Sequence, residues 1–86
     1  MTTTTLVSAP MTGTVVVDNF SFSPGVLRVA VGGTVTWDFR ETVHTVEIDG
    51  RVLRSTGPTS MTFSAAGTYN YNCGPHPSMQ GRIVVE

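Results

Sequence analysis

The segment with the clearest chemistry is Cys73–Met79, which places a thiol, an imidazole and a thioether at a Cys-x2-His-x2-Met spacing. Sulfur and imidazole side chains of this kind are ligands for transition metals. Pro75 and Pro77 each fix their own φ angle and restrict the residue before them, so the loop has little conformational freedom. The spacing therefore predicts a loop that holds Cys73, His76 and Met79 around one point.

This set of donors favours copper over other metals. Zinc sites use Cys, His and carboxylates rather than Met, and calcium prefers oxygen ligands. An iron–sulfur cluster usually requires four cysteines, whereas Cys73 is the only cysteine in the chain. Two His, one Cys and a weak axial Met form the ligand set of blue-copper sites. The second histidine is expected to be His44, because the chain contains no other candidate.

Each ligand residue also has an ordinary structural interpretation. Cys73 alone could be a buried thiol that packs as a small hydrophobic residue, and His44 alone could be a surface histidine on a strand. Cys73 and His76 could also form a Cys–His nucleophile. A hydrolase would need an oxyanion hole and a substrate pocket, for which a small β domain has little room. We therefore expect a metal-binding protein that is not an enzyme.

The remaining sequence predicts an all-β fold. Short runs in which apolar and polar residues alternate predict about seven strands, at 14–19, 26–31, 34–39, 43–48, 60–65, 67–73 and 81–86. Turn signals such as Gly32-Gly33 and Asp49-Gly50 fall between these runs. Strands of this length and spacing favour a Greek-key β-sandwich. Residues 51–59 are expected to be a connection without a strand.

Composition limits the domain organisation and the partners. The 86 residues form one domain over 14–86, preceded by a loosely ordered segment over 1–13. The net charge is −1 and the five arginines are scattered, so a nucleic-acid partner is not expected. No apolar run approaches the roughly 20 residues that cross a bilayer, and no signal peptide is recognised. The charged residues Asp38, Arg40, Glu41, Glu47 and Asp49 are expected to lie on solvated strand edges and turns.

Several motifs follow one another in a distinctive order. Phe20–Pro24 (Phe-Ser-Phe-Ser-Pro) is followed by Gly33–Trp37 (Gly-Thr-Val-Thr-Trp), by His44, by Gly67–Cys73 (Gly-Thr-Tyr-Asn-Tyr-Asn-Cys) and by the ligand loop. Together they resemble the cupredoxin family of blue copper proteins over residues 14–86, and the short ligand loop resembles that of its amicyanin branch. Two positions depart from the family pattern. Thr45 stands where Asn is frequent and is expected to reach less far, and Ser78 replaces an aromatic residue.

The resemblance implies a site and a function. His44, Cys73 and His76 would bind one copper ion in a plane, both histidines through Nδ1, with Met79 as the weak axial ligand. The implied function is one-electron transfer by a Cu(II)/Cu(I) couple between redox proteins that dock transiently near His76. The implied protein is a monomer located in the periplasm or otherwise outside the cytoplasm. The alternatives are copper storage or delivery, and a non-redox cupredoxin domain of a larger protein.

Overall fold

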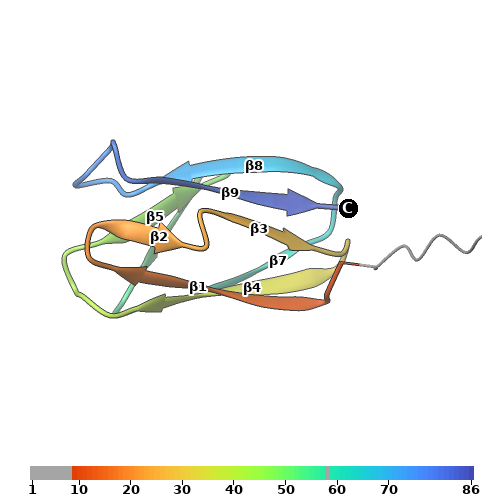
Figure 1. Ribbon diagram of the computed structural model, residues 1–86, viewed down its shortest axis with the longest axis horizontal. Helices are drawn as coiled ribbons and strands as arrows, with labels where there is room; N and C mark the ends of the chain where they lie inside the picture. The colour runs from red at the N-terminus through yellow and green to blue at the C-terminus, as the bar shows by residue number, and fades with distance from the viewer. Residues whose placement is uncertain (1–8, 58) are drawn as a thin grey trace, which may run out of the picture.

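The computed structural model describes residues 9–57 and 59–86, and every regular element in this part of the chain is a β-strand (Figure 1). The strands in chain order are β1 (Thr12–Asp18), β2 (Ser21–Ser23), β3 (Val26–Val29), β4 (Gly33–Phe39), β5 (Thr45–Ile48), β6 (Arg51–Arg54), β7 (Ser60–Phe63), β8 (Gly67–Asn72) and β9 (Gln80–Val85). Within the same residues, no helix has the length and apolarity that crossing a membrane requires.

The strands form two sheets that pack face to face. One sheet has four strands in the order β2-β1-β4-β7, and the other has five in the order β3-β9-β8-β5-β6. β1 pairs with β4 in parallel and β3 pairs with β9 in parallel, whereas the other neighbours are antiparallel. The two layers are visible in Figure 1. The prediction of an all-β sandwich is therefore confirmed.

The predicted number of about seven strands is wrong, because the described residues contain nine. The interpretation of residues 51–59 as a connection missed β6. Ile48 and Arg51 pair across a two-residue turn in which Asp49 has φ 50° and Gly50 has φ 76°. Positive φ at both central residues is the geometry of the tight hairpin turn that Asp-Gly favours. The Asp-Gly pair was thus a hairpin signal and not only a break between strands.

The second missed strand is β2, which forms a hairpin with β1. Asp18 pairs with Ser21 across a turn made by Asn19 and Phe20, with φ angles of 50° and 57°. Asn adopts this left-handed conformation fairly readily, but a bulky residue such as Phe rarely does. Because the turn contains no glycine, it carries little local signal for a hairpin.

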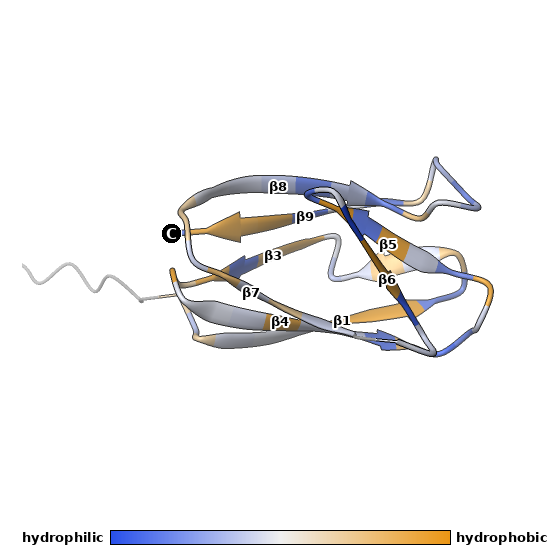
Figure 2. Cartoon of the chain, turned by 180° about the vertical axis from the view of Figure 1, so that it is seen from behind, coloured by the Kyte–Doolittle hydropathy of each residue, from blue (hydrophilic) through white to orange (hydrophobic). Residues whose placement is uncertain are grey.

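The core lies between the sheets and follows the alternation of each strand. Trp37, Phe63 and Ile83 are at most 2% exposed, and Figure 2 shows apolar residues concentrated along β1 and the end of β9. Trp37 and Tyr71 meet edge to face, with ring centroids 5.4 Å apart. Such aromatic pairs add about 0.5–1.5 kcal/mol beyond the burial of their area. The core therefore fixes β4 against β8, the strand that leads to Cys73.

Strand ends place the predicted ligands. β5 begins at Thr45, so His44 directly precedes it; β8 ends at Asn72, so Cys73 directly follows it. The ligand loop then connects β8 to its antiparallel neighbour β9. At the other end of the chain, β1 begins at Thr12, while residues 1–8 of the predicted loose segment lie outside the described part.

Candidate metal centre

Three of the four predicted ligands meet at the end of the sandwich where β8 runs into the ligand loop. The Cys73 Sγ atom lies 3.8 Å from the His44 Nδ1 atom and 3.7 Å from the His76 Nδ1 atom. Ligand atoms of all three residues lie within 4.8 Å of one another. The histidines thus present to the sulfur the ring nitrogens that the family resemblance implies.

These distances fit a shared metal ion. Metal–sulfur and metal–nitrogen bonds of about 2.3 and about 2.0 Å, as for zinc, separate the two ligand atoms by about 3.7 Å at a trigonal angle. The two sulfur–nitrogen distances are 3.7 and 3.8 Å. The residues are therefore already spaced for an ion to lie between them, and the mixture of thiolate and imidazole suits copper.

The three residues differ in exposure. Cys73 is 0% exposed and His44 is 1% exposed, whereas His76 is partly exposed. A metal held here would be shielded by the protein on the side of His44 and Cys73. The His76 ring would be the ligand nearest to solvent.

Backbone hydrogen bonds close the ligand loop. The Cys73 N–H donates to the Met79 carbonyl at 3.0 Å, and the Met79 N–H donates to the His76 carbonyl at 2.8 Å. Met79 is 5% exposed. The loop therefore returns the chain to Cys73 and leaves the Met79 side chain buried.

Thr45 joins the two segments that carry ligands. Its N–H lies 3.4 Å from the Cys73 Sγ atom, and its hydroxyl accepts a hydrogen bond of 3.0 Å from the Gly74 N–H. A Cβ atom at Gly74 would lie 3.1 Å from the Thr45 hydroxyl oxygen and would overlap the Glu47 carboxylate. The short reach expected of Thr45 is thus sufficient, because glycine at position 74 lets the loop approach β5 closely.

Glu41 orients His44 from the side opposite the sulfur. Its Oε1 atom lies 2.7 Å from the His44 Nε2 atom, and this hydrogen bond is the largest cause that lowers the pKa of Glu41. Because a carboxylate only accepts hydrogen bonds, the proton of a neutral His44 belongs on Nε2. Nδ1 is then left free for a metal. The interpretation of Glu41 as merely solvated missed this contact, although its position three residues before a ligand histidine was an available signal.

Phe20 is a second residue that sequence reasoning did not connect to the site. Its ring centroid lies 5.3 Å from that of His44 and 5.0 Å from that of His76, and it is nearly perpendicular to both. Its exposed fraction is 58%. The only local signal was the aromatic pattern of Phe20–Pro24, which says nothing about a contact with residues so distant in sequence.

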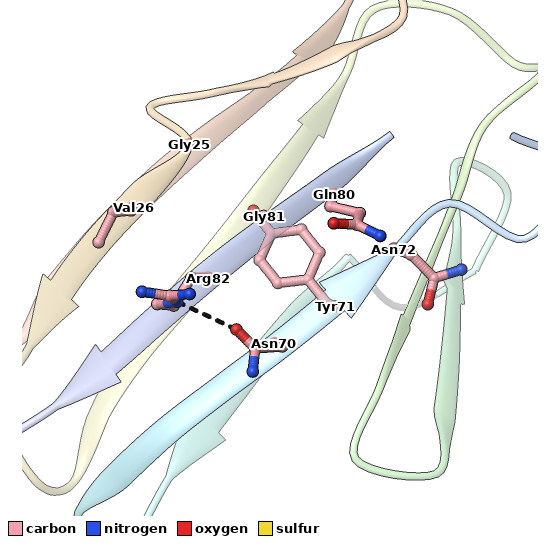
Figure 3. A pocket seen from close by; sticks show the side chains of 8 residues that line it. All are labelled: Gly25, Val26, Asn70, Tyr71, Asn72, Gln80, Gly81 and Arg82. Atoms are coloured by element: carbon pink, nitrogen blue, oxygen red, sulfur yellow. Dashed lines mark hydrogen bonds between the residues drawn. The ribbon is translucent and has the colours of Figure 1, made fainter. Parts of the chain in front are cut away.

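A separate groove of about 620 Å³ crosses the five-stranded sheet beside Tyr71 (Figure 3). Asn70, Asn72, Gln80 and Arg82 provide its polar lining. The Arg82 Nε–H already donates to the Asn70 side-chain oxygen at 3.0 Å. None of the predicted ligands lines this groove, so it is distinct from the metal centre.

The two-sheet sandwich, with His, Cys and His converging at one end, defines a cupredoxin. The profile of the copper-binding plastocyanin/azurin family matches residues 45–86. Amicyanin from Paracoccus denitrificans is 40% identical over 87 residues, which cover 86% of this chain and 66% of that protein. Amicyanin-alpha from Methylorubrum extorquens is 39% identical over 71 residues, which cover 70% of this chain and 60% of that protein.

Solved structures agree with the sequence matches. A reduced proline-to-phenylalanine variant of amicyanin superposes with a TM-score of 0.73 at 35% identity, over 91% of this chain and 82% of that one. An oxidised methionine-to-lysine variant gives a TM-score of 0.71 at 36% identity. This chain therefore belongs to the plastocyanin/azurin family of copper-binding cupredoxins. It spans 66% and 60% of the length of the two amicyanins named above.

Proposed function

We propose that this protein is a one-electron carrier in which His44, Cys73, His76 and Met79 hold a single copper ion. The observation that carries the proposal is the convergence of the Cys73 sulfur with two histidine Nδ1 atoms at distances that fit a shared ion. When bound, copper supplies the change between Cu(II) and Cu(I). The protein itself supplies one sulfur and two imidazole nitrogens that already lie together.

A stiff site favours rapid electron transfer, because little needs to move when the charge changes. His44 is fixed by Glu41, and the ligand loop is closed by the bonds between Cys73 and Met79. The Thr45 N–H points at the Cys73 sulfur, where it would stabilise negative charge on the thiolate. Met79 is assigned as the weak axial ligand because of its burial at the end of the loop.

We assign the exit for the electron to the partly exposed His76. Exposed apolar residues occur on the segments of this end, with Phe20 58% and Val43 54% exposed and the two loop prolines also exposed. Exposed apolar residues of this kind suit brief contact with a redox protein, since transient electron-transfer interfaces are small. The protein would act as a monomer that meets a donor and an acceptor in turn and catalyses no reaction. A location in the periplasm follows from the family resemblance.

The test is a visible absorption spectrum after one equivalent of Cu(II), followed by ascorbate. We expect an intense blue band that ascorbate bleaches and that an oxidant restores. Cys73→Ser should abolish the band, whereas Ser78→Ala, an exposed position in the same loop, should retain it. Copper binding without a reversible blue band would refute electron transfer and favour storage or delivery instead.

The axial assignment has a matched control within the chain. Met79→Leu should keep copper bound, because the weak axial ligand contributes least, but should change the reduction potential. Met61→Leu replaces a methionine that is also buried, at 7% exposure, on β7, and should leave the potential unchanged. Equal potentials for the wild type and Met79→Leu would remove Met79 from the ligand set.

A further inference from the structure

The turn between β1 and β2 places an aromatic ring in an unusual backbone conformation. Phe20 has φ 57° and is 58% exposed. A left-handed conformation is an outlier for a bulky residue, and an outlier of this kind persists only where surrounding structure enforces it. Because Phe20 is exposed, it is not part of the hydrophobic core. Packing in the core therefore does not explain its backbone conformation.

The ring of Phe20 contacts both histidines of the metal centre. It lies nearly perpendicular to each, at interplanar angles of 87° to His44 and 88° to His76. Edge-to-face contact is a favoured aromatic geometry. Because the Phe20 ring is largely exposed while His44 is buried, the ring forms an outer layer over the imidazoles on this side.

Two hydrogen bonds attach this turn to the segment that carries His44. The Asn19 N–H donates at 3.0 Å to the same Glu41 oxygen that contacts the His44 Nε2 atom. The Arg40 N–H donates at 2.9 Å to the Val17 carbonyl, at the end of β1. The turn is therefore positioned relative to His44 by bonds that do not involve the Phe20 side chain.

The two histidines differ in how they are restrained. Among the described residues, His44 has hydrogen-bonding contacts at both ring nitrogens, with Glu41 and with the Cys73 sulfur. Within the part of the chain that the structure describes, the His76 ring has such a contact only at Nδ1, with the same sulfur. The His76 ring is further restrained by its neighbouring rings, Phe20 at 5.0 Å and His44 at 5.3 Å between centroids. Of these two rings, Phe20 covers the His76 ring from the exposed side.

We propose that Phe20 is a positioning residue that holds the His76 ring in its metal-binding orientation before the metal enters. It also covers the centre against water on this side once the ion is bound. The second statement rests on the proposed copper function, whereas the first concerns the metal-free protein. The left-handed backbone conformation of the turn places the Phe20 ring against the two histidines.

The metal-free protein provides the first test, by NMR with labelled histidine. Phe20→Asn removes the ring but suits the turn, because Asn tolerates positive φ. Asn19→Gly is the matched control, since it changes the same turn and keeps both the ring and the backbone N–H. We expect contacts between the His44 and His76 rings in the wild type and in Asn19→Gly. In Phe20→Asn they should be lost, with His76 signals broadened by motion on the μs–ms timescale.

Copper release to a chelator provides the second test. Phe20→Asn should release copper roughly tenfold faster than the wild type, from the loss of two aromatic contacts, and Phe20→Tyr should restore the slow rate. If Phe20→Asn did not fold, Phe20→Leu would replace the aromatic ring with another apolar side chain and allow the same measurements. Unchanged His76 signals and an unchanged release rate would overturn the proposal. A wild type without a blue copper band would instead refute the proposed function, and the metal-free NMR would still decide the role of Phe20.

Discussion

Thr45 offers a direct test of how the two ligand-bearing segments are joined. Thr45→Val keeps the shape and the β-branching of the side chain but removes the hydroxyl that accepts the Gly74 N–H at 3.0 Å. The backbone N–H of Thr45, which points at the Cys73 sulfur, remains. The substitution therefore removes one side-chain hydrogen bond and leaves the ligands themselves unchanged.

The expected loss follows from what happens to the Gly74 N–H. A buried donor without a partner costs about 1–3 kcal/mol, but Gly74 is only partly buried, so water can replace part of the lost bond. We therefore expect Thr45→Val to lower the free energy of unfolding by about 1 kcal/mol. For a domain of this size, that corresponds to a fall in melting temperature of about 4–8 °C.

Denaturant unfolding of the metal-free protein measures this loss, with Thr45→Ser as the control that keeps a hydroxyl. With copper bound, Thr45→Val should retain the blue band but lose the metal to a chelator faster, because the loop is less firmly attached to β5. A Thr45→Val protein as stable as the wild type would show that the contact with Gly74 does not join the segments.

Further predictions concern groups around the core and the site. Burial raises the pKa of Tyr71 to about 12, so the unfolded chain loses this proton first and the metal-free protein should lose stability as the pH rises from about 10. The nearby Trp37 N–H opposes this pKa shift but does not reach hydrogen-bond geometry with the Tyr71 hydroxyl. Tyr71→Phe should therefore remove the loss of stability at alkaline pH without lowering stability at neutral pH. An unchanged dependence of stability on alkaline pH in denaturant titrations would contradict this. Gly81→Ala should destabilise the protein by about 1–3 kcal/mol, because the added Cβ would overlap the Tyr71 ring (Figure 3). Gly57→Ala is the control in thermal melts and should have no effect, because a Cβ at Gly57 meets no atom within 4 Å. Glu41→Gln should weaken copper binding roughly tenfold in competition titrations. The hydrogen bond to His44 lowers the pKa of Glu41, so the stability that this bond contributes should be lost as the pH falls through the lowered pKa. An acid-unfolding curve of Glu41→Gln identical to that of the wild type would show that the bond makes no such contribution.

The ligand loop could be predicted because its information is local. Cys73, His76 and Met79 lie on one short segment, and proline stiffness together with donor chemistry identifies the site without knowledge of the fold. His44 followed because it was the only other histidine. The sandwich followed from alternation along the strands, each of which has one face in the core.

The contacts of Phe20 and Glu41 could not be predicted in the same way. Phe20 reaches the histidines because β1 lies parallel to β4, with Val17 opposite Phe39. That pairing brings the turn after β1 beside the segment after β4. No local pattern encodes a parallel pairing between distant strands, and the Asn19-Phe20 turn lacks the glycine that marks most tight hairpins.

The parallel pairing of β3 with β9 affects how the site comes into existence. The last strand must find a partner from the first third of the chain, and sheets built from such distant segments fold in milliseconds to seconds rather than microseconds. The pairing of β8 with β9 across the ligand loop is local, but the five-stranded sheet is complete only when β3 also pairs with β9. Until the sandwich closes, the Cys73 thiol is open to solvent and oxidants. A sulfinic or sulfonic acid formed at Cys73 in that interval could not be reversed by simple reduction. The yield of metal-competent protein after refolding should therefore depend on the presence of a reductant, even though the native protein buries Cys73 completely.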